Sequence, residues 1–386
     1  MKTENDKKWA ENVLKKIVNK MMWVTPKTGD KIPYKTMDGT YDDRSDESIA
    51  WGGGDGINWW TNGFWGGILW QMYHQTKDDM FKNSAIRVED KLDRCFEEFY
   101  GLHHDVGFMW MTSAVYDYKL TGNEVARKRA LHAATILAGR FNLNGNFIRA
   151  WNENEQPEKN CTGWAIIDCM MNLSILYWAS KETKDPRFAA IAKAHANTAQ
   201  KVFIREDGSS NHIVEFDPNT GKVVKTYGGQ GYENGSAWSR GQAWAVYGFT
   251  ISYEHTKDMS YLETAEKVAD YCCANIPESG LIPCDFCQPK EPVWEDSCGA
   301  VILASGLLQL AKHAQAKKAE LYYEKALCIL KAIVESRSDW TENSDAIVTN
   351  CTAAYHDKEH HFNMVYADYF FIEAIQKLQG NTIDLW

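Results

Sequence analysis

The sequence lacks the features that mark several common classes of protein. No apolar run reaches about eighteen residues, so no membrane-spanning helix is expected. The chain carries 42 Lys and Arg against 52 Asp and Glu, a formal net charge of -10, and so lacks the basic excess typical of nucleic-acid binding. Residues 1–16 are charged and amphipathic, without the apolar centre of a signal peptide.

A disulfide framework is also missing from the pattern of cysteines. The ten cysteines are scattered along the chain, and their spacing is unlike that of small cross-linked scaffolds. This distribution suits free thiols in a reducing compartment. Together with the missing signal peptide, it predicts a cytoplasmic protein.

Aromatic residues, in contrast, are abundant, with 16 Trp, 18 Tyr and 15 Phe. Their flat faces stack on the apolar faces of sugar rings, although large aromatic side chains are also ordinary core material. The composition is therefore compatible with a carbohydrate ligand without establishing one.

Apolar periodicity predicts twelve helices. Their ranges are 5–23, 62–77, 79–99, 104–121, 123–140, 162–182, 185–203, 238–257, 259–276, 294–315, 319–337 and 364–379. Four of the junctions repeat a pattern in which a helix ends at Thr and an acid or amide caps the next helix two residues later, at Asp78, Asn123, Asp185 and Asp258. The helices therefore form pairs.

The two members of a pair differ in polarity. The first member is apolar nearly all round, as in residues 163–179, and the second has one polar face, as in residues 185–196. Helices that are apolar all round must be buried, and amphipathic helices cover them. The pattern predicts an all-α fold, an (α/α)6 toroid formed by one domain over residues 1–386, with a small β-hairpin at 211–227. The longer loops should meet at one mouth of the ring, where a site is expected.

Two charged residues stand alone in these apolar segments. Asp168 is the only charged residue between Lys159 and Lys181, in the second turn of its predicted helix, and Arg240 has no charged neighbour between Glu233 and Glu254. A buried carboxyl tends towards a raised pKa, which suits a proton donor, but a carboxyl satisfied by nearby amides would look the same. Similarly, Arg240 with Trp244 one turn later could hold an acidic sugar, or Arg240 could pair with a loop acid.

A further acid is predicted at the same mouth. Asp105 follows His103 and His104 and opens a predicted helix, where by itself it is best explained as an N-cap. Two neighbouring carboxylates do not both ionise easily, and paired carboxylates are typical of glycoside chemistry.

Other patterns give no metal or cofactor site. Cys284-x-x-Cys287 has no partner pair, and the histidines at 103–104 and 360–361 lack the spacing of a metal-binding helix. The glycine run at 51–56 is neither a Walker loop nor a dinucleotide fingerprint. We expect no metal and no organic cofactor.

Several short motifs, in order over nearly the whole chain, resemble the unsaturated glucuronyl hydrolases of glycoside hydrolase family 88. They are Gly56-x-x-Trp59-Trp60-x-x-Gly63-Phe64-x-x-Gly67, His104-Asp105-x-Gly107-Phe108, Arg149-Ala150-Trp151, the helix around Asp168, Ser239-Arg240 with Trp244, and the stretch 367–374. Members of this family have a six-hairpin toroid, which agrees with the helix pattern.

The resemblance implies that the substrate is an acidic disaccharide or short oligosaccharide of glycosaminoglycan type whose terminal uronic acid has a C4=C5 double bond. Asp168 matches the residue that protonates C4 and then takes a proton from the water that attacks C5, and Asp105 matches the second essential acid. The remaining matched positions, which would bind substrate, are Trp59, His104, Trp151, His212, Gln230, Arg240 and Trp244. We expect a monomer or weak homo-oligomer.

Three alternatives remain open at this point. An unsaturated rhamnogalacturonyl hydrolase would share the toroid and the hydration chemistry but act on pectin fragments. A toroidal sugar epimerase would leave the double bond intact and would favour paired histidines in the mouth. A non-catalytic glycan-binding toroid would turn nothing over, and would leave the isolated Asp168 and Arg240 unexplained.

Overall fold

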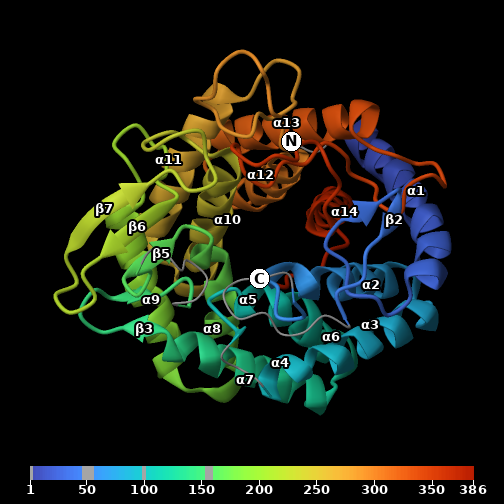
Figure 1. Ribbon diagram of the computed structural model, residues 1–386. Helices are drawn as coiled ribbons and strands as arrows, with labels where there is room; N and C mark the ends of the chain where they lie inside the picture. Colours follow the sequence, from blue (N-terminus) through green and yellow to red (C-terminus); the bar gives the residue numbers. More distant parts are fainter. Residues whose placement is uncertain (1–2, 46–55, 98–100, 153–159) are drawn as a thin grey trace.

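A computed structural model describes residues 3–45, 56–97, 101–152 and 160–386. In these residues the helices form a ring of two layers, which Figure 1 shows in a view along its axis. The inner helices are α2 (Phe64–Thr76), the α5–η3–α6 stretch (Val106–Trp110, Met111–Val115 and Tyr116–Thr121), α8 (Cys169–Thr183), α10 (Ser239–Thr256), α12 (Ser297–Leu310) and α14 (Val365–Gln379). The outer helices are α1 (Glu4–Thr28), α3 (Asp79–Leu92) with the short α4 (Arg94–Glu97), α7 (Glu124–Gly139), α9 (Pro186–Val202), α11 (Met259–Asn275) and α13 (Ala316–Ser336).

The burial of each layer follows its sequence pattern. Every residue of the inner helix α12 is buried, whereas the outer helix α3 buries one face that includes Phe81, Ala85, Val88 and Leu92. Helix α1 packs against α14 and so closes the ring between the two ends of the sequence. The predicted (α/α)6 toroid is confirmed.

The repeated junctions have the predicted caps. The side chains of Asp78, Asn123, Asp185 and Asp258 each accept a hydrogen bond from the backbone N–H two residues later, at 2.9 to 3.0 Å. The residue before each cap has a positive φ, which ends the inner helix in a left-handed turn. This compact junction lets the outer helix fold back along the inner one.

The strands are short and lie at the mouth of the ring. Two pairs, β1 (Thr36–Met37) with β2 (Thr40–Tyr41) and β3 (Phe141–Asn142) with β4 (Phe147–Ile148), are antiparallel. The hairpin predicted at 211–227 is present as β6 (Ile213–Phe216) and β7 (Val223–Tyr227), and β5 (Trp164–Ile166) extends it to a three-stranded sheet.

Strand β5 corrects the prediction of a helix from residue 162. The segment Trp164–Ile166 pairs with β6, and α8 begins only at Cys169. Asp168 therefore immediately precedes the helix and does not lie in its second turn. A short run that is apolar all round fits a buried strand as well as a buried helix, so periodicity alone could not separate the two.

Two predicted features lie partly outside the described residues. Of the glycine run at 51–56, the structure describes only Gly56, and the helix predicted at 79–99 is described to residue 97. All ten cysteines are free thiols. Among the described helices, none combines the length and apolar character that a bilayer crossing requires.

Candidate active site

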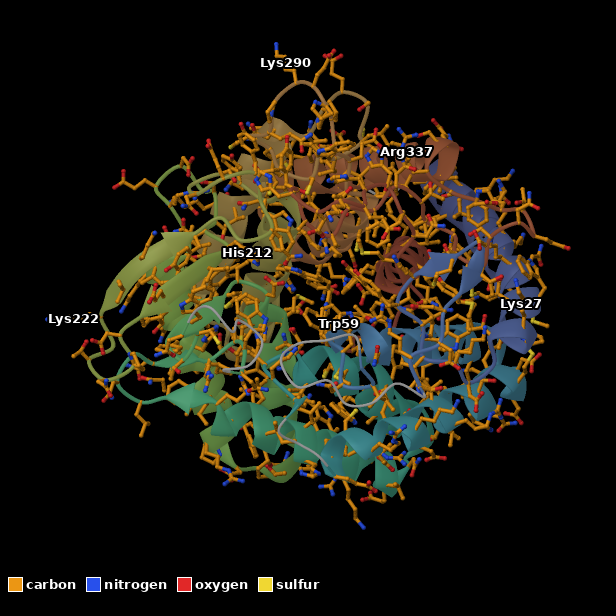
Figure 2. All side chains as sticks on the ribbon, viewed as in Figure 1. Lys27, Trp59, His212, Lys222, Lys290 and Arg337 are labelled. Carbon is orange, nitrogen blue, oxygen red and sulfur yellow. The ribbon has the colours of Figure 1, made fainter. Side chains whose placement is uncertain are left out.

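A cavity of about 750 Å³ opens where the N-terminal ends of the inner helices meet. Asp168, Asp105, His212, Gln230, Arg240, Trp59 and Trp151, all predicted from the sequence, line it. In the view along the axis, His212 and Trp59 lie near the centre of the ring, whereas Lys27 and Lys222 lie at its edge (Figure 2). Seven of the nine predicted site residues therefore converge on one space.

The cavity end of α8 presents the Asp168 carboxyl. Its side chain is 13% exposed, and its Oδ1 has no hydrogen-bond partner among the described residues. Burial, and next the negative charge of Asp105, raise the pKa of Asp168 to about 8, against the opposing effect of Arg240. Asp168 is therefore mostly protonated at neutral pH and can donate a proton.

Asp105 is held in the opposite charge state. Asn172 Nδ2 donates to Asp105 Oδ1 at 2.8 Å, and Oδ2 lies 3.3 Å from His104 Nε2. Burial raises the pKa of Asp105, but His104 and this hydrogen bond outweigh it and hold the pKa below its usual range. The two carboxyls thus form a pair in which Asp105 is ionised and Asp168 is protonated.

The hydrogen bond from Asn172 to Asp105 depends on a close approach of the inner helices α5 and α8. A Cβ at Gly107 would lie 2.5 Å from Asn172 Oδ1, so only glycine lets α5 approach α8 so closely. The same Asn172 Oδ1 accepts from the Phe108 N–H at 2.7 Å. Asn172 was not predicted as a site residue, although it stands one turn after Asp168 as a lone amide in an apolar helix.

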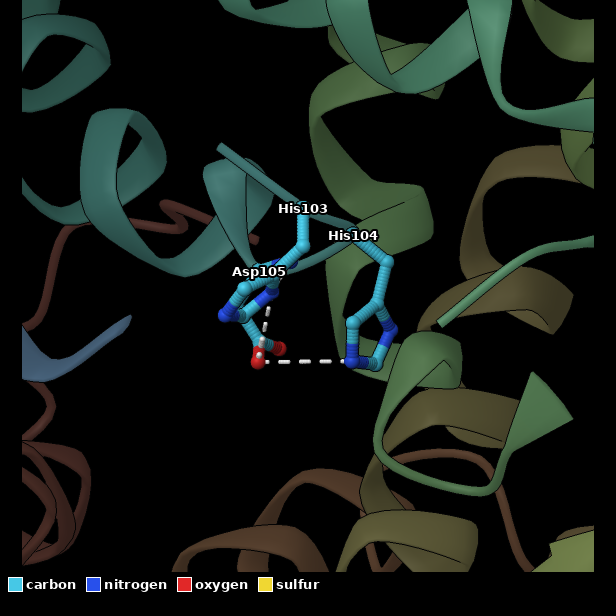
Figure 3. A group of neighbouring side chains, drawn as sticks. All are labelled: His103, His104 and Asp105. Carbon is cyan, nitrogen blue, oxygen red and sulfur yellow. Dashed lines mark hydrogen bonds and ion pairs between the residues drawn. The ribbon is translucent and has the colours of Figure 1, made fainter. Parts of the chain in front are cut away.

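The two histidines before Asp105 contact its carboxylate (Figure 3): His103 Nδ1 lies 3.5 Å and His104 Nε2 3.3 Å from Asp105 Oδ2. With Asp105 they bring three potential metal-ligand atoms within 4.8 Å of one another. However, His103 Nδ1 accepts the Asp105 N–H at 3.2 Å, and burial lowers the pKa of His103 to about 3. A hydrogen bond to the Asp105 backbone thus accounts for His103, whereas neither ring nitrogen of His104 has a hydrogen-bond partner among the described residues. The absence of a metal stays a prediction. His104 is fully buried behind Asp105 and does not line the cavity.

His212 faces Asp168 across the cavity. Its Nε2 lies 3.6 Å from Asp168 Oδ1, and its Nδ1 accepts the Gln230 N–H at 3.1 Å. Burial lowers the pKa of His212 to about 3, so the ring is neutral. Nδ1 also lies 3.3 Å from the Gly228 carbonyl, and the shorter of the two contacts, in which the Gln230 N–H donates, places the ring proton on Nε2. The Nε2–H group has no partner among the described residues and is available to a ligand.

The Arg240 guanidinium is largely occupied by protein groups. Nε donates to Asp296 Oδ2 at 3.0 Å, Nη1 donates to the Tyr366 hydroxyl, and Nη2 donates to the carbonyls of Thr352 and Ala353. Four of the five N–H groups are thus used, and one on Nη1 remains. Of the two readings of Arg240, the pairing with an acid is present, to Asp296, and the one N–H left over would allow a single hydrogen bond to a substrate carboxylate.

The aromatic residues divide into walls and floor. Trp59 and Trp151 line the cavity as predicted. Trp244 does not line it: its ring is fully buried between Phe108 and Phe370, with ring centroids 5.0 and 5.4 Å away. Its N–H approaches Asp168 closely enough to lower the pKa of that carboxyl without reaching full hydrogen-bond geometry. Trp244 therefore forms the floor beneath Asp168, which corrects the prediction that it binds substrate directly.

Further lining residues were not predicted. They are Tyr34, Trp60, His103, Trp164, Ile166, Ile213, Tyr227, Gly229, Asn234, Trp238, Ala353, Ala354, Asp357 and Tyr366. Trp238 could have been predicted from the sequence, because it stands two residues before Arg240. In the structure its ring centroid lies 4.2 Å from that of His212. Tyr34 and Tyr366 had no such signal, since only closure of the ring brings them together.

Comparison with known proteins agrees with this geometry. Residues 24–366 match Glycosyl Hydrolase Family 88. The chain is 34% identical to the unsaturated glucuronyl hydrolase of Bacillus sp. (strain GL1) over 335 residues, which cover 85% of this chain and 88% of that protein. It is 32% identical to the unsaturated chondroitin disaccharide hydrolase of Streptococcus pneumoniae (strain ATCC BAA-255 / R6) over 322 residues, 82% of this chain and 81% of the relative.

A solved structure extends the likeness to the whole fold. The crystal structure of the Bacillus sp. GL1 unsaturated glucuronyl hydrolase superposes with a TM-score of 0.86 at 30% identity and covers 97% of both chains. The chain belongs to glycoside hydrolase family 88.

Proposed function

We propose that this protein releases the terminal 4,5-unsaturated uronic acid from glycosaminoglycan-type oligosaccharides by hydrating the vinyl ether double bond. One observation carries the proposal: the Asp168 carboxyl, whose pKa is raised to about 8, faces the cavity beside Asp105, whose pKa is held below its usual range. A single carboxyl that gives a proton and then takes one back needs a pKa close to the working pH.

In the proposed reaction, the Asp168 carboxyl donates its proton to C4, and the π electrons of the C4=C5 bond form the new C4–H bond. The positive charge at C5 is shared with the ring oxygen. Water then adds to C5 while the Asp168 carboxylate accepts a proton from it, which restores the starting acid. The resulting hemiketal opens: the C5–O5 bond breaks, C5 becomes a ketone, and the proton of the C5 hydroxyl ends on O5. The hemiacetal left at C1 then breaks its bond to the glycosidic oxygen, which takes the remaining hydroxyl proton and leaves as a hydroxyl of the second sugar, while C1 becomes an aldehyde.

The other lining groups would orient the substrate. Trp59 and Trp151 supply aromatic faces for the sugar rings, and the free His212 Nε2–H can donate to a substrate oxygen. Gln230 Nε2 donates to the Ala353 carbonyl at 2.8 Å, which leaves its Oε1 to accept from a sugar hydroxyl. Arg240 would bind the uronate carboxylate through its one remaining N–H. Asp105 would accept hydrogen bonds from ring hydroxyls, and its negative charge would keep Asp168 protonated.

The substrate class follows from the relatives, whose names specify unsaturated glucuronyl and unsaturated chondroitin disaccharide substrates. We further propose a single catalytic domain over residues 1–386, without metal or cofactor, acting as a monomer or weak homo-oligomer. Ten free thiols support a cytoplasmic location.

The test is a panel of unsaturated disaccharides of chondroitin, heparin and rhamnogalacturonan type, followed by the absorbance of the double bond. We expect absorbance to disappear with a glycosaminoglycan-type member and to persist with the Asp168→Asn variant. Loss of absorbance only with the rhamnogalacturonan type would favour the pectin alternative. Persistence with every member would refute hydration and leave a binding toroid or an epimerase.

A further inference from the structure

The second end of the ring is closed by the segment that follows α14. Residues Asn381–Trp386 cross the ring at the C-terminal ends of the inner helices, and the end of the chain appears at the ring centre in Figure 1. A second cavity of about 680 Å³ opens there, lined among others by Lys119, Trp178, His255 and Trp386. The ring thus has a cavity at each end, and side chains between them must keep the two apart.

Hydrogen bonds fix this segment to two inner helices. Lys119 Nζ in α6 donates to the carbonyls of Asp384 and Leu385 at 2.5 and 2.9 Å. The Trp386 Nε1–H donates to Glu373 Oε1 of α14 at 2.6 Å, and the residue is 8% exposed. The indole is therefore inserted into the interior in one orientation.

Four aromatic rings separate the two cavities. The Trp386 ring stacks on Phe370, with centroids 6.0 Å apart and an angle of 10°, and meets Phe108 at 6.1 Å. Phe370 and Phe108 are the two rings that hold Trp244, whose N–H approaches Asp168. Trp386 thus contacts Phe370 and Phe108, and these two rings in turn hold Trp244, which lies beneath the proposed proton donor Asp168.

We propose that Trp386 is a positioning residue for Asp168: it holds Trp244 in place from the far end of the ring and keeps water of the second cavity away from the Asp168 carboxyl. This inference rests on the proposed function and names a residue about which the hydration mechanism itself says nothing. The physical reason is that desolvation is the largest cause of the raised pKa of Asp168. Desolvation requires that water be excluded from below, at the aromatic floor, as well as from the cavity side.

The charged groups on the two sides of the aromatic layer are different sets. Asp168 faces Asp105 from the start of α5, Arg240 from α10 and His212 from beside β6. Around Trp386 lie Glu373 and Lys377 of α14, whose charged atoms are 3.4 Å apart, together with Lys119 and His255. A substitution at Trp386 can therefore change the pKa of Asp168 in two ways: by moving the aromatic rings between them, or by letting water replace those rings.

The experiment compares Trp386→Leu with Trp178→Leu, which removes another tryptophan that lines the second cavity but does not contact Phe108 or Phe370. For Trp386→Leu we expect kcat to fall at least about 10-fold with KM within about 2-fold, and the alkaline limb of the kcat profile to move down by about one pH unit. Trp178→Leu should leave kcat and the alkaline limb of its pH profile close to wild type. Trp386→Phe, which keeps the stack on Phe370, should restore most of kcat and the wild-type profile.

A folded Trp386→Leu protein with wild-type kcat and an unshifted profile would overturn the proposal, as would equal effects of the two leucine variants. If Trp386→Leu does not fold, Trp386→Met, which fills the space with a flexible chain, is judged by the same criteria. A readout without turnover separates this inference from the proposed function: carbon NMR of the labelled Asp168 carboxyl, assigned with Asp168→Asn. An unchanged titration in the Trp386 variant contradicts the inference whether or not the enzyme hydrates unsaturated uronates.

Discussion

The carboxyl of Asp168 occupies a place where ionisation is unfavourable, between a buried floor and a second, ionised acid. Trp244 lies beneath it and Asp105 contributes negative charge. Arg240, whose positive charge opposes the rise in the pKa of Asp168, is already paired with Asp296. Such a site costs stability, since the folded state prefers the protonated form of a group that would ionise freely in water. We interpret this cost as the condition for acid catalysis at neutral pH.

Replacing Asp168 by asparagine should separate catalysis from folding. Asn cannot give or take the proton, so kcat should fall by at least about 10³-fold, while its size preserves substrate binding. Because the raised folded-state pKa makes wild-type stability fall from about pH 4 to about pH 8, the neutral Asn should raise Tm at pH 7, by about 1–3 °C. Steady-state kinetics, ligand binding and thermal unfolding test this, and wild-type turnover would remove Asp168 from the mechanism.

The pH dependence of the reaction should follow the same carboxyl. In the proposed reaction only protonated Asp168 can donate to C4, so kcat/KM should decline as pH rises through about 8. In Asp105→Asn, loss of the neighbouring negative charge should lower the Asp168 pKa and move the alkaline limb towards acid pH, in addition to reducing kcat. An alkaline limb at the same pH in both proteins would show that Asp105 does not control the protonation of Asp168.

At the scale of elements, Arg240 ties α10 to the start of α12 and to residues 352–353. Arg240 and Asp296 side chains are 2% and 0% exposed, so Arg240→Ala leaves a buried carboxylate without its cation. We expect a loss of about 3–5 kcal/mol in the free energy of unfolding, besides weaker binding. In the matched control Arg337→Ala, which breaks the more exposed pair with the adjacent Glu295, the loss should be about 1 kcal/mol or less. Urea unfolding compares the two, and equal losses would contradict a supporting role for Arg240.

The segment 353–357 forms one rim of the cavity and makes its charge more negative. Among the described lining residues, Arg240 is the one Lys or Arg, whereas Asp357 adds an exposed acid. We therefore expect sulfated disaccharides to have a lower kcat/KM than their unsulfated counterparts. Asp357→Asn should reduce the difference by about 2–5-fold, and Glu359→Gln, an exposed acid outside the cavity, should not. A preference of the wild-type protein for sulfated substrates would refute this account of the rim.

The elements that repeat were predictable, and the contacts between distant segments were not. The Thr and Asp or Asn at each junction specify a local turn, so the helix pairs and the toroid followed from neighbouring residues. The strand at 164–166 and the start of α8 at Cys169 depend on pairing with β6, about fifty residues later, which no local pattern contains. Similarly, the isolation of Arg240 in the sequence gave no sign of Asp296, Thr352 or Tyr366 as its partners.

At the scale of the whole molecule, the site exists only when the ring is closed. Tyr34 and Trp59 from the first sixth of the chain share the cavity with Asp357 and Tyr366 from its end, and α1 packs against α14. The same closure brings Trp386 beneath the floor. The isolation of Asp168 indicated a possible proton donor, and the family resemblance supplied the reaction, but the walls and the floor of the cavity are properties of the assembled ring.

The charge of the whole molecule should also govern how the substrate arrives. A protein of net charge -10 repels an anionic uronate, and the cavity rim, with Asp357 and a paired Arg240, offers little local compensation. Salt screens this repulsion, so kcat/KM should rise, by about 2-fold or more, between about 10 mM and about 150 mM NaCl, with kcat nearly constant. The methyl ester of the same unsulfated disaccharide carries no charge, so its kcat/KM should not change with the salt concentration. If kcat/KM for the free acid instead falls with salt, a local positive field must outweigh the net charge, and Arg240, the one lysine or arginine among the described lining residues, is then its source.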